Sequence, residues 1–162
     1  MEITMSRYEQ LRSIERARVE RENAYWTPLQ EAAGSTVKAV EDYLELPSKA
    51  FELQGKAERY VSLGLYSAGD FETLRPFQLS GEDGLVPFNI AVAIETAPNA
   101  YPKRKVIINF EASYDDKDLF VSIQPGDELE EHIQITGPES YQAVAEAVYG
   151  LIERSIDMQY PD

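Results

Sequence analysis

The sequence predicts an α+β fold: two N-terminal helices, an antiparallel sheet of about six strands arranged as a meander, and a C-terminal helix packed on that sheet. Apolar residues recur at helical spacing over the first third of the chain, and then alternate with polar residues. Helical spacing returns after Gly137-Pro138. At 162 residues the chain is expected to form one domain. Its expected parts are a helical segment 1–55, a sheet 57–136 and a helix 138–157.

The first helix is expected to begin at Ser6, because Ser6 and Glu9 have the spacing of a capping box. A narrow apolar stripe then follows one side of this helix. Its members are Tyr8, Leu11, Ile14 and Tyr25. Such a stripe predicts that the helix docks by one edge and presents a charged face elsewhere.

A second helix is expected to begin at Thr27-Pro28, because threonine is a good N-cap and proline suits the first helical position. Leu46-Pro47 is expected to end it. A short helical turn over Ser48–Gln54, closed by Gly55, is predicted to follow.

Six alternating segments predict the sheet, and the short connections between them favour antiparallel neighbours. The expected strands begin near Val61, 71, Phe88, Val106, Leu119 and Ile133. Pro76 predicts an edge strand or a bulge in the second of them. The last helix carries a broad apolar stripe that is expected to cover the apolar sheet face. Its main members are Val144, Val148, Leu151 and Ile152.

Negative charge is the strongest global feature, with a formal net charge of −14. Residues 1–59 carry 11 acids and 9 bases, whereas residues 60–162 carry 18 acids and 6 bases. The densest part, 111–131, has 8 acids and only Lys117 as a base. Such a surface repels nucleic acid and anionic membranes and attracts basic proteins or cations, although it also serves solubility.

Several classes of protein are excluded or disfavoured. The chain has no cysteine, which excludes disulfides, thiolate metal sites and thiol catalysis. No segment approaches the roughly 20 apolar residues that cross a bilayer, and the N-terminus does not have the pattern of a signal peptide. A cytoplasmic protein is therefore expected.

His132 is the only histidine, and it follows four acids. Alternation with Ile133 and Ile135 places it on the polar side of the sheet, where no ligand spacing matches a metal motif. No serine is placed beside it by the sequence, so a serine–histidine pair is not predicted. A pair of carboxylates for glycoside hydrolysis leaves no signature in sequence and stays open. The segment Tyr114–Asp118 is interpreted as a hairpin tip.

Small acidic α+β chains resemble, in size and charge, several bacterial and phage binding proteins: immunity proteins that neutralise toxins, secretion chaperones, and inhibitors that imitate the charge of DNA. The first hypothesis is therefore a non-enzymatic module without cofactor, metal or catalytic residues, which covers a basic surface of a partner protein, possibly one that binds nucleic acid. Its oligomeric state is left open. The expected partner-binding residues are Glu95, Glu111, Asp115, Asp116, Asp118, Glu128, Glu130 and Glu131.

The alternative hypothesis is a small-ligand-binding or hydrolytic domain. Its pocket would lie between a curved sheet and the C-terminal helix. The residues expected to line that pocket are Tyr60, Tyr66, Phe88 and Tyr141. A cavity of several hundred Å³ at that place would favour this hypothesis over the first.

Overall fold

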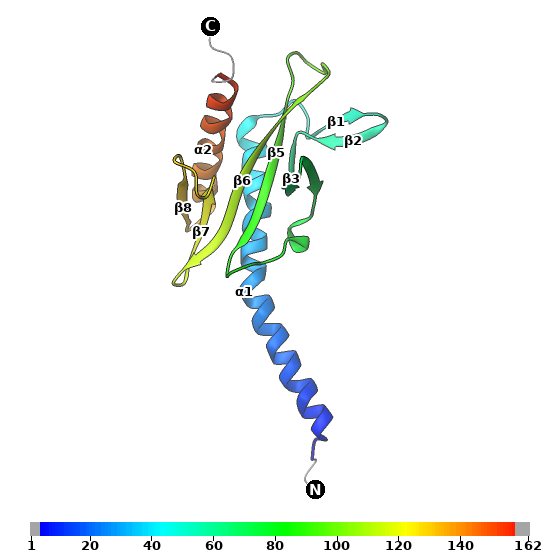
Figure 1. Cartoon of the computed structure of the whole chain (residues 1–162), viewed down its shortest axis with the longest axis vertical. Helices are drawn as coiled ribbons and strands as arrows, with labels where there is room; N and C mark the ends of the chain where they lie inside the picture. The colour runs from blue at the N-terminus through cyan, green and yellow to red at the C-terminus, as the bar shows by residue number, and fades with distance from the viewer. Residues whose placement is uncertain (1–3, 158–162) are drawn as a thin grey trace.

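The computed structural model describes residues 4–157 and has an α+β fold with a mostly antiparallel sheet. Figure 1 shows the sheet, the helices on one side of it, and a long helical extension that leaves the body. The helices and strands are α1 (Arg7–Leu44), β1 (Ala50–Leu53), β2 (Lys56–Arg59), β3 (Val61–Ser67), β4 (Asp70–Thr73), the 3-10 turn η1 (Pro76–Gln78), β5 (Val86–Ile94), β6 (Arg104–Asp115), β7 (Asp118–Ile123), β8 (Glu131–Ile135) and α2 (Pro138–Asp157).

A single helix of 38 residues replaces the two predicted N-terminal helices. Ser6 is its N-cap as expected, since its hydroxyl accepts from the Glu9 amide at 3.1 Å. Pro28 lies inside the helix rather than at the start of a second one. The prediction of a new helix start was wrong because the apolar residues before and after Pro28 lie on the same side of one continuous helix. Packing of these residues on the sheet offsets the free energy that the helix loses because proline has no amide to donate.

Two further local predictions were wrong. The segment 48–54 is not helical, because β1 pairs with β2 as a hairpin. Gln54 and Gly55 form its turn with φ of 52° and 78°, the left-handed conformations that a two-residue hairpin needs. The expected strand at 71–79 is confined to β4, an edge strand, and Pro76 begins η1 instead.

The main sheet has the strand order β4-β3-β5-β6-β7-β8, and all neighbouring pairs are antiparallel. From β5 to β8 it is the predicted meander. At the other side, β5 pairs with β3 and leaves β4 at the edge. This order differs from the predicted meander because β3 and β4 form a tight hairpin, in which Ser67 pairs with Asp70, and β3 then pairs with β5 on its other side.

The core lies between one face of the sheet and the two helices. The second half of α1 contacts β3, β5 and β6, whereas α2 contacts β7 and β8. Both helices therefore cover the apolar face of the sheet, which was predicted to be covered by α2 alone. Leu29 and Val40 of α1 and Val144 and Val148 of α2 are buried. Leu151, predicted in the same stripe, packs half-buried against this core.

Candidate functional site

Six acids gather at the two ends of β7. Figure 1 shows the β6–β7 turn at the lower end of β7 and the β7–β8 loop at its upper end. Because β7 has six residues at ~3.3 Å each, the two groups lie roughly 17–20 Å apart along the strand. We call this set the acidic stripe: Asp115, Asp116, Asp118, Glu128, Glu130 and Glu131, all of them exposed.

The first end of the acidic stripe is a tight hairpin. Asp115 pairs with Asp118, which leaves Asp116 and Lys117 at the tip. Asp116 has φ 58°, a left-handed conformation that aspartate tolerates better than most residues. The turn therefore projects three carboxylates into solvent, and the prediction that 114–118 forms a hairpin tip agrees with the structure.

The second end is a loop fixed by its own hydrogen bonds. The Asp127 amide donates to the Gln124 carbonyl at 3.1 Å, and the Glu130 amide donates to the Asp127 carbonyl at 3.0 Å. The Asp127 carboxylate also accepts from the Leu129 amide at 3.1 Å. Glu128, Glu130 and Glu131 consequently stand on an ordered loop, with the exposed Leu129 among them.

None of the six acids has a salt-bridge partner within residues 4–157. The four ion pairs there join Arg18 to Glu15 and to Glu22, Arg59 to Glu41, and Lys103 to Glu95. The charge of the acidic stripe is therefore not cancelled by direct contact with the rest of the described chain.

The two remaining candidates, Glu111 and Glu95, differ from the acidic stripe. Glu111 is half-buried on the open sheet face, opposite Ser122 of β7. Glu95 follows the end of β5 and binds Lys103 at 2.8 Å. The structure thus places Glu95 in an internal ion pair rather than beside the acidic stripe.

Lys103 is an enclosed charge, with a side chain only 4% exposed. Its ammonium lies 4.2 Å from the ring centroid of Tyr101 and 4.8 Å from that of Phe51. It also donates to the Ala100 carbonyl at 2.9 Å. This cage ties the β5–β6 connection to the β1–β2 hairpin, because Phe51 is a residue of β1.

The ion pair shifts both pKa values. The hydrogen bond from Lys103 lowers the pKa of the Glu95 carboxyl, and Glu95 in turn raises the pKa of Lys103. The Tyr60 hydroxyl donates to Glu95 at 3.0 Å; burial, and then this carboxylate, raise the pKa of Tyr60. Each group is thereby held in its neutral-pH form, which suits a structural contact rather than proton transfer.

His132 lies on the polar face, as predicted, but the structure places Ser122 beside it. The Ser122 hydroxyl and His132 Nδ1 are 2.6 Å apart, and the imidazole stacks on Phe120 at 4.2 Å. Sequence reasoning missed this pair, because only the β7–β8 register, which sets Ser122 opposite His132, brings the two together. Register is not readable from alternation alone.

The Ser122–His132 pair lacks the other parts of a nucleophilic site. Ser122 is only 4% exposed, and its neighbour on the other side is Glu111, so the carboxylate stands next to the serine instead of the histidine. In acyl-transfer triads the acid orients the histidine. The contact therefore fixes a side chain on the sheet face. No group of three or more potential metal ligands occurs among the described residues.

The four residues expected to line a ligand pocket are not brought together. Phe88 stacks on Phe110 at 5.0 Å inside the core, and Tyr60 is buried in a separate cluster with Phe51. The ring of Tyr66 is exposed, and only Tyr141 borders a groove. The space between sheet and helices is thus filled at Phe88, where the alternative hypothesis places a cavity.

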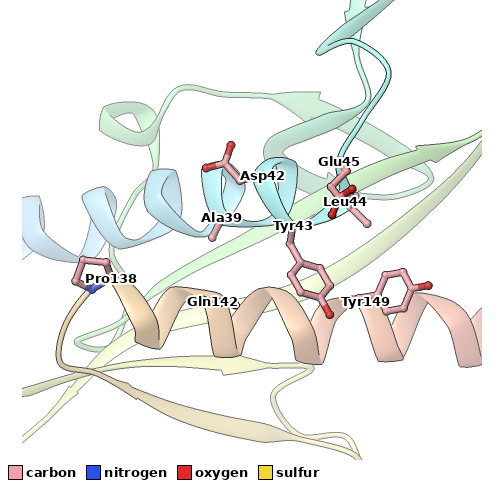
Figure 2. A pocket seen from close by; sticks show the side chains of 8 residues that line it. All are labelled: Ala39, Asp42, Tyr43, Leu44, Glu45, Pro138, Gln142 and Tyr149. Atoms are coloured by element: carbon pink, nitrogen blue, oxygen red, sulfur yellow. The ribbon is translucent and has the colours of Figure 1, made fainter.

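Two open grooves instead lie between α1 and α2, with volumes of about 780 and 600 Å³. Figure 2 shows the larger one, where Tyr43 of α1 points towards α2 next to Tyr149. These two rings are 5.7 Å apart. Asp42 lines both grooves and Glu45 the larger one, so each groove has a carboxylate at its rim.

Comparison of the chain with family models, with curated proteins and with solved structures found no match. Within residues 4–157, no helix has the length and apolar character needed to cross a membrane.

Proposed function

We propose that this protein is a non-enzymatic binding module that covers a basic surface of a partner protein with its acidic stripe. The proposal rests on the exposure, the position and the missing ion pairs, within residues 4–157, of the six acids of the acidic stripe. They are exposed, they stand on hydrogen-bonded turns, and they have no cationic partner in the described chain. Fixed like charges cost folding stability through repulsion, and a basic partner would relieve that cost.

The spacing of the acidic stripe supports an extended basic groove as its target. Two groups of three carboxylates roughly 17–20 Å apart along β7 cannot converge on one metal ion, whose oxygen ligands lie within ~2.6 Å of it. A groove that binds nucleic acid meets phosphates at intervals of ~3.4 Å along each strand. We therefore propose an inhibitor of the immunity or chaperone type, or one that imitates the charge of nucleic acid. A chain without cysteines suits the cytoplasm, where we place this binding.

The test compares three forms of the full chain, immobilised and exposed to a lysate of the source cells. The first is the wild type, and the second is Asp116→Lys/Glu130→Lys, which reverses one charge at each end of the acidic stripe. The control is Glu146→Lys/Glu153→Lys, which makes the same change in net charge at two exposed positions of α2.

A partner retained by the wild type and by the α2 control, but lost with the stripe variant, would support the proposal. Equal loss with both variants would show that only net charge matters. Retention by all three would contradict a role of the acidic stripe.

A further inference from the structure

The first 18 residues of α1 extend beyond the body as a free helical arm. We call residues 7–24 the arm, and Figure 1 shows this part of α1 leaving the body. At its base, the Tyr114 hydroxyl of β6 donates to the Tyr25 carbonyl, and Trp26 lies against Gly81. At ~1.5 Å per residue the arm is about 27 Å long. Most helical stability in proteins comes from packing of an apolar face, so a surface that covers the arm would stabilise it.

The arm exposes large apolar side chains on one face. Tyr8, Leu11 and Ile14 are 66%, 62% and 65% exposed. The predicted stripe is thus present, but the described chain offers nothing for it to dock on. Three neighbouring apolar side chains at helical spacing are typical of a helix that packs against another surface.

This apolar face continues an interface that is already formed. Steps of three or four residues lead from Leu11 through Ile14, Arg18, Glu22 and Tyr25 to the buried Leu29, which packs on the sheet. In the middle of the series, Arg18 binds Glu22 at 2.6 Å and Glu15 at 2.6 Å. The charges on this face are therefore paired with each other.

The charge distribution makes the arm the part of the chain at which a second copy can approach. The arm has five arginines and four glutamates, a net of +1, whereas the remaining residues have 10 bases and 25 acids, a net of −15. The bodies of two copies repel each other, but their arms do not. An antiparallel arrangement would hold the acidic bodies at opposite ends of the paired arms, several Debye lengths apart.

We propose that two copies of this chain associate through antiparallel pairing of their arms. The register that sets Glu9 of one arm opposite Ala24 of the other also sets Tyr8 opposite Tyr25. In the same register Arg18 lies opposite Glu15 of the second copy, and Ile14 lies opposite Val19. The tip of each arm reaches the base of the other, where Phe77, 68% exposed, lies beside α1 through the bond from Gln30 to its carbonyl.

The base of the arm is negatively charged, whereas the tip of the second copy's arm carries an arginine. The Tyr25 hydroxyl donates to the Gly84 carbonyl at 2.8 Å, which places the loop with Glu82 and Asp83 at the base. The tip brings Arg7, opposite Trp26 in this register, to this level. The turn 115–118 follows Tyr114, whose hydroxyl donates to the Tyr25 carbonyl at 3.3 Å at the arm base.

Sedimentation of the full chain over ~1–100 µM tests the pairing. The wild type is expected to be a dimer at the higher concentrations, and Leu11→Glu/Ile14→Glu a monomer. Ser13→Glu/Asn23→Glu adds the same charge on the opposite side of the arm and is expected to remain dimeric. All four positions are exposed, and melting curves check that each variant is folded. A monomeric wild type, or equal behaviour of the two variants, would overturn the proposal.

Distances between labels test the direction. The chain has no cysteine, so single-cysteine variants can be labelled specifically. Labels at position 9 in both copies are expected about 22 Å apart, from 15 residues of helical rise. Mixed dimers with one label at 9 and the other at 24 are expected to give a clearly shorter distance. A 9–9 distance shorter than the 9–24 distance would mean that the arms pair in parallel, and it would refute the antiparallel arrangement. Neither experiment changes a residue of the acidic stripe, so its outcome is distinguishable from that of the test of the proposed function.

Discussion

Val148 gives a sharp test of the packing of α2 on the sheet. Its side chain is fully buried in the cluster that also contains Val121 and Ile123 of β7. Val148→Ala removes two methyl groups, which costs about 1–2 kcal/mol in transfer free energy plus a cavity contribution. Val148→Asp also buries a carboxyl group without a partner, so its total cost is expected to exceed about 3 kcal/mol.

Differential scanning calorimetry converts these costs into melting temperatures. For a chain of this size, about 1 kcal/mol corresponds to ~2–4 °C, so Val148→Asp should melt at least ~6 °C below the wild type. Ala143→Asp is the matched control, because position 143 is exposed on the same helix. There the same side chain should cost less than about 1 kcal/mol, mainly through helix propensity. A Val148→Asp variant that melts like this control would refute the packing of α2.

Three further predictions concern the sheet. Lys103→Met strands the Glu95 carboxylate and should lower the melting temperature more than the Glu95→Gln/Lys103→Met double variant does; equal losses would contradict a coupled pair. Since the pKa of Glu95 is lowered from 4.5 and that of Lys103 is raised from 10.5, the pair contributes stability between about those pH values. Relative to the double variant, the wild type should therefore lose stability below pH 4.5 and above 10.5. His132→Ala should leave partner binding unchanged in a titration and cost about 1–3 kcal/mol through the unpaired Ser122 hydroxyl; lost binding would give His132 a functional role. Gly64→Ala should cost at least about 1–3 kcal/mol in chemical denaturation, because a Cβ there meets the Glu72 carbonyl of β4; an unchanged midpoint would contradict that close approach.

Periodicity predicted the parts of the fold that depend on one buried face. The change from helical spacing to alternation located the sheet, and the stripe at 144–152 located α2, because burial of one side determines both patterns. The same reasoning failed at Pro28. A start signal describes local preference only, whereas continuous packing of α1 on the sheet decides whether a helix ends there.

The candidate site was predictable to the extent that it consists of turns. Asp116 at a hairpin tip and the acids at 128–131 follow from composition and position. The partners of Glu95 and His132 were not predictable, because they depend on which residues of other strands or connections face them. Lys103 reaches Glu95 across the β5–β6 connection, and Ser122 meets His132 across the β7–β8 pair. No pattern within one strand encodes either contact.

The most direct test of the proposed function is the association rate of the captured partner, measured by stopped flow between ~50 and 500 mM salt. Over that range the Debye length falls severalfold, so attraction between the acidic stripe and a basic surface is progressively screened. We predict an association rate that falls steeply with salt. We also predict that Asp116→Lys/Glu130→Lys slows association more than it speeds dissociation, whereas Glu146→Lys/Glu153→Lys does neither to the same extent. An association rate independent of salt, or equal to the wild-type rate in the stripe variant, would contradict binding through the acidic stripe.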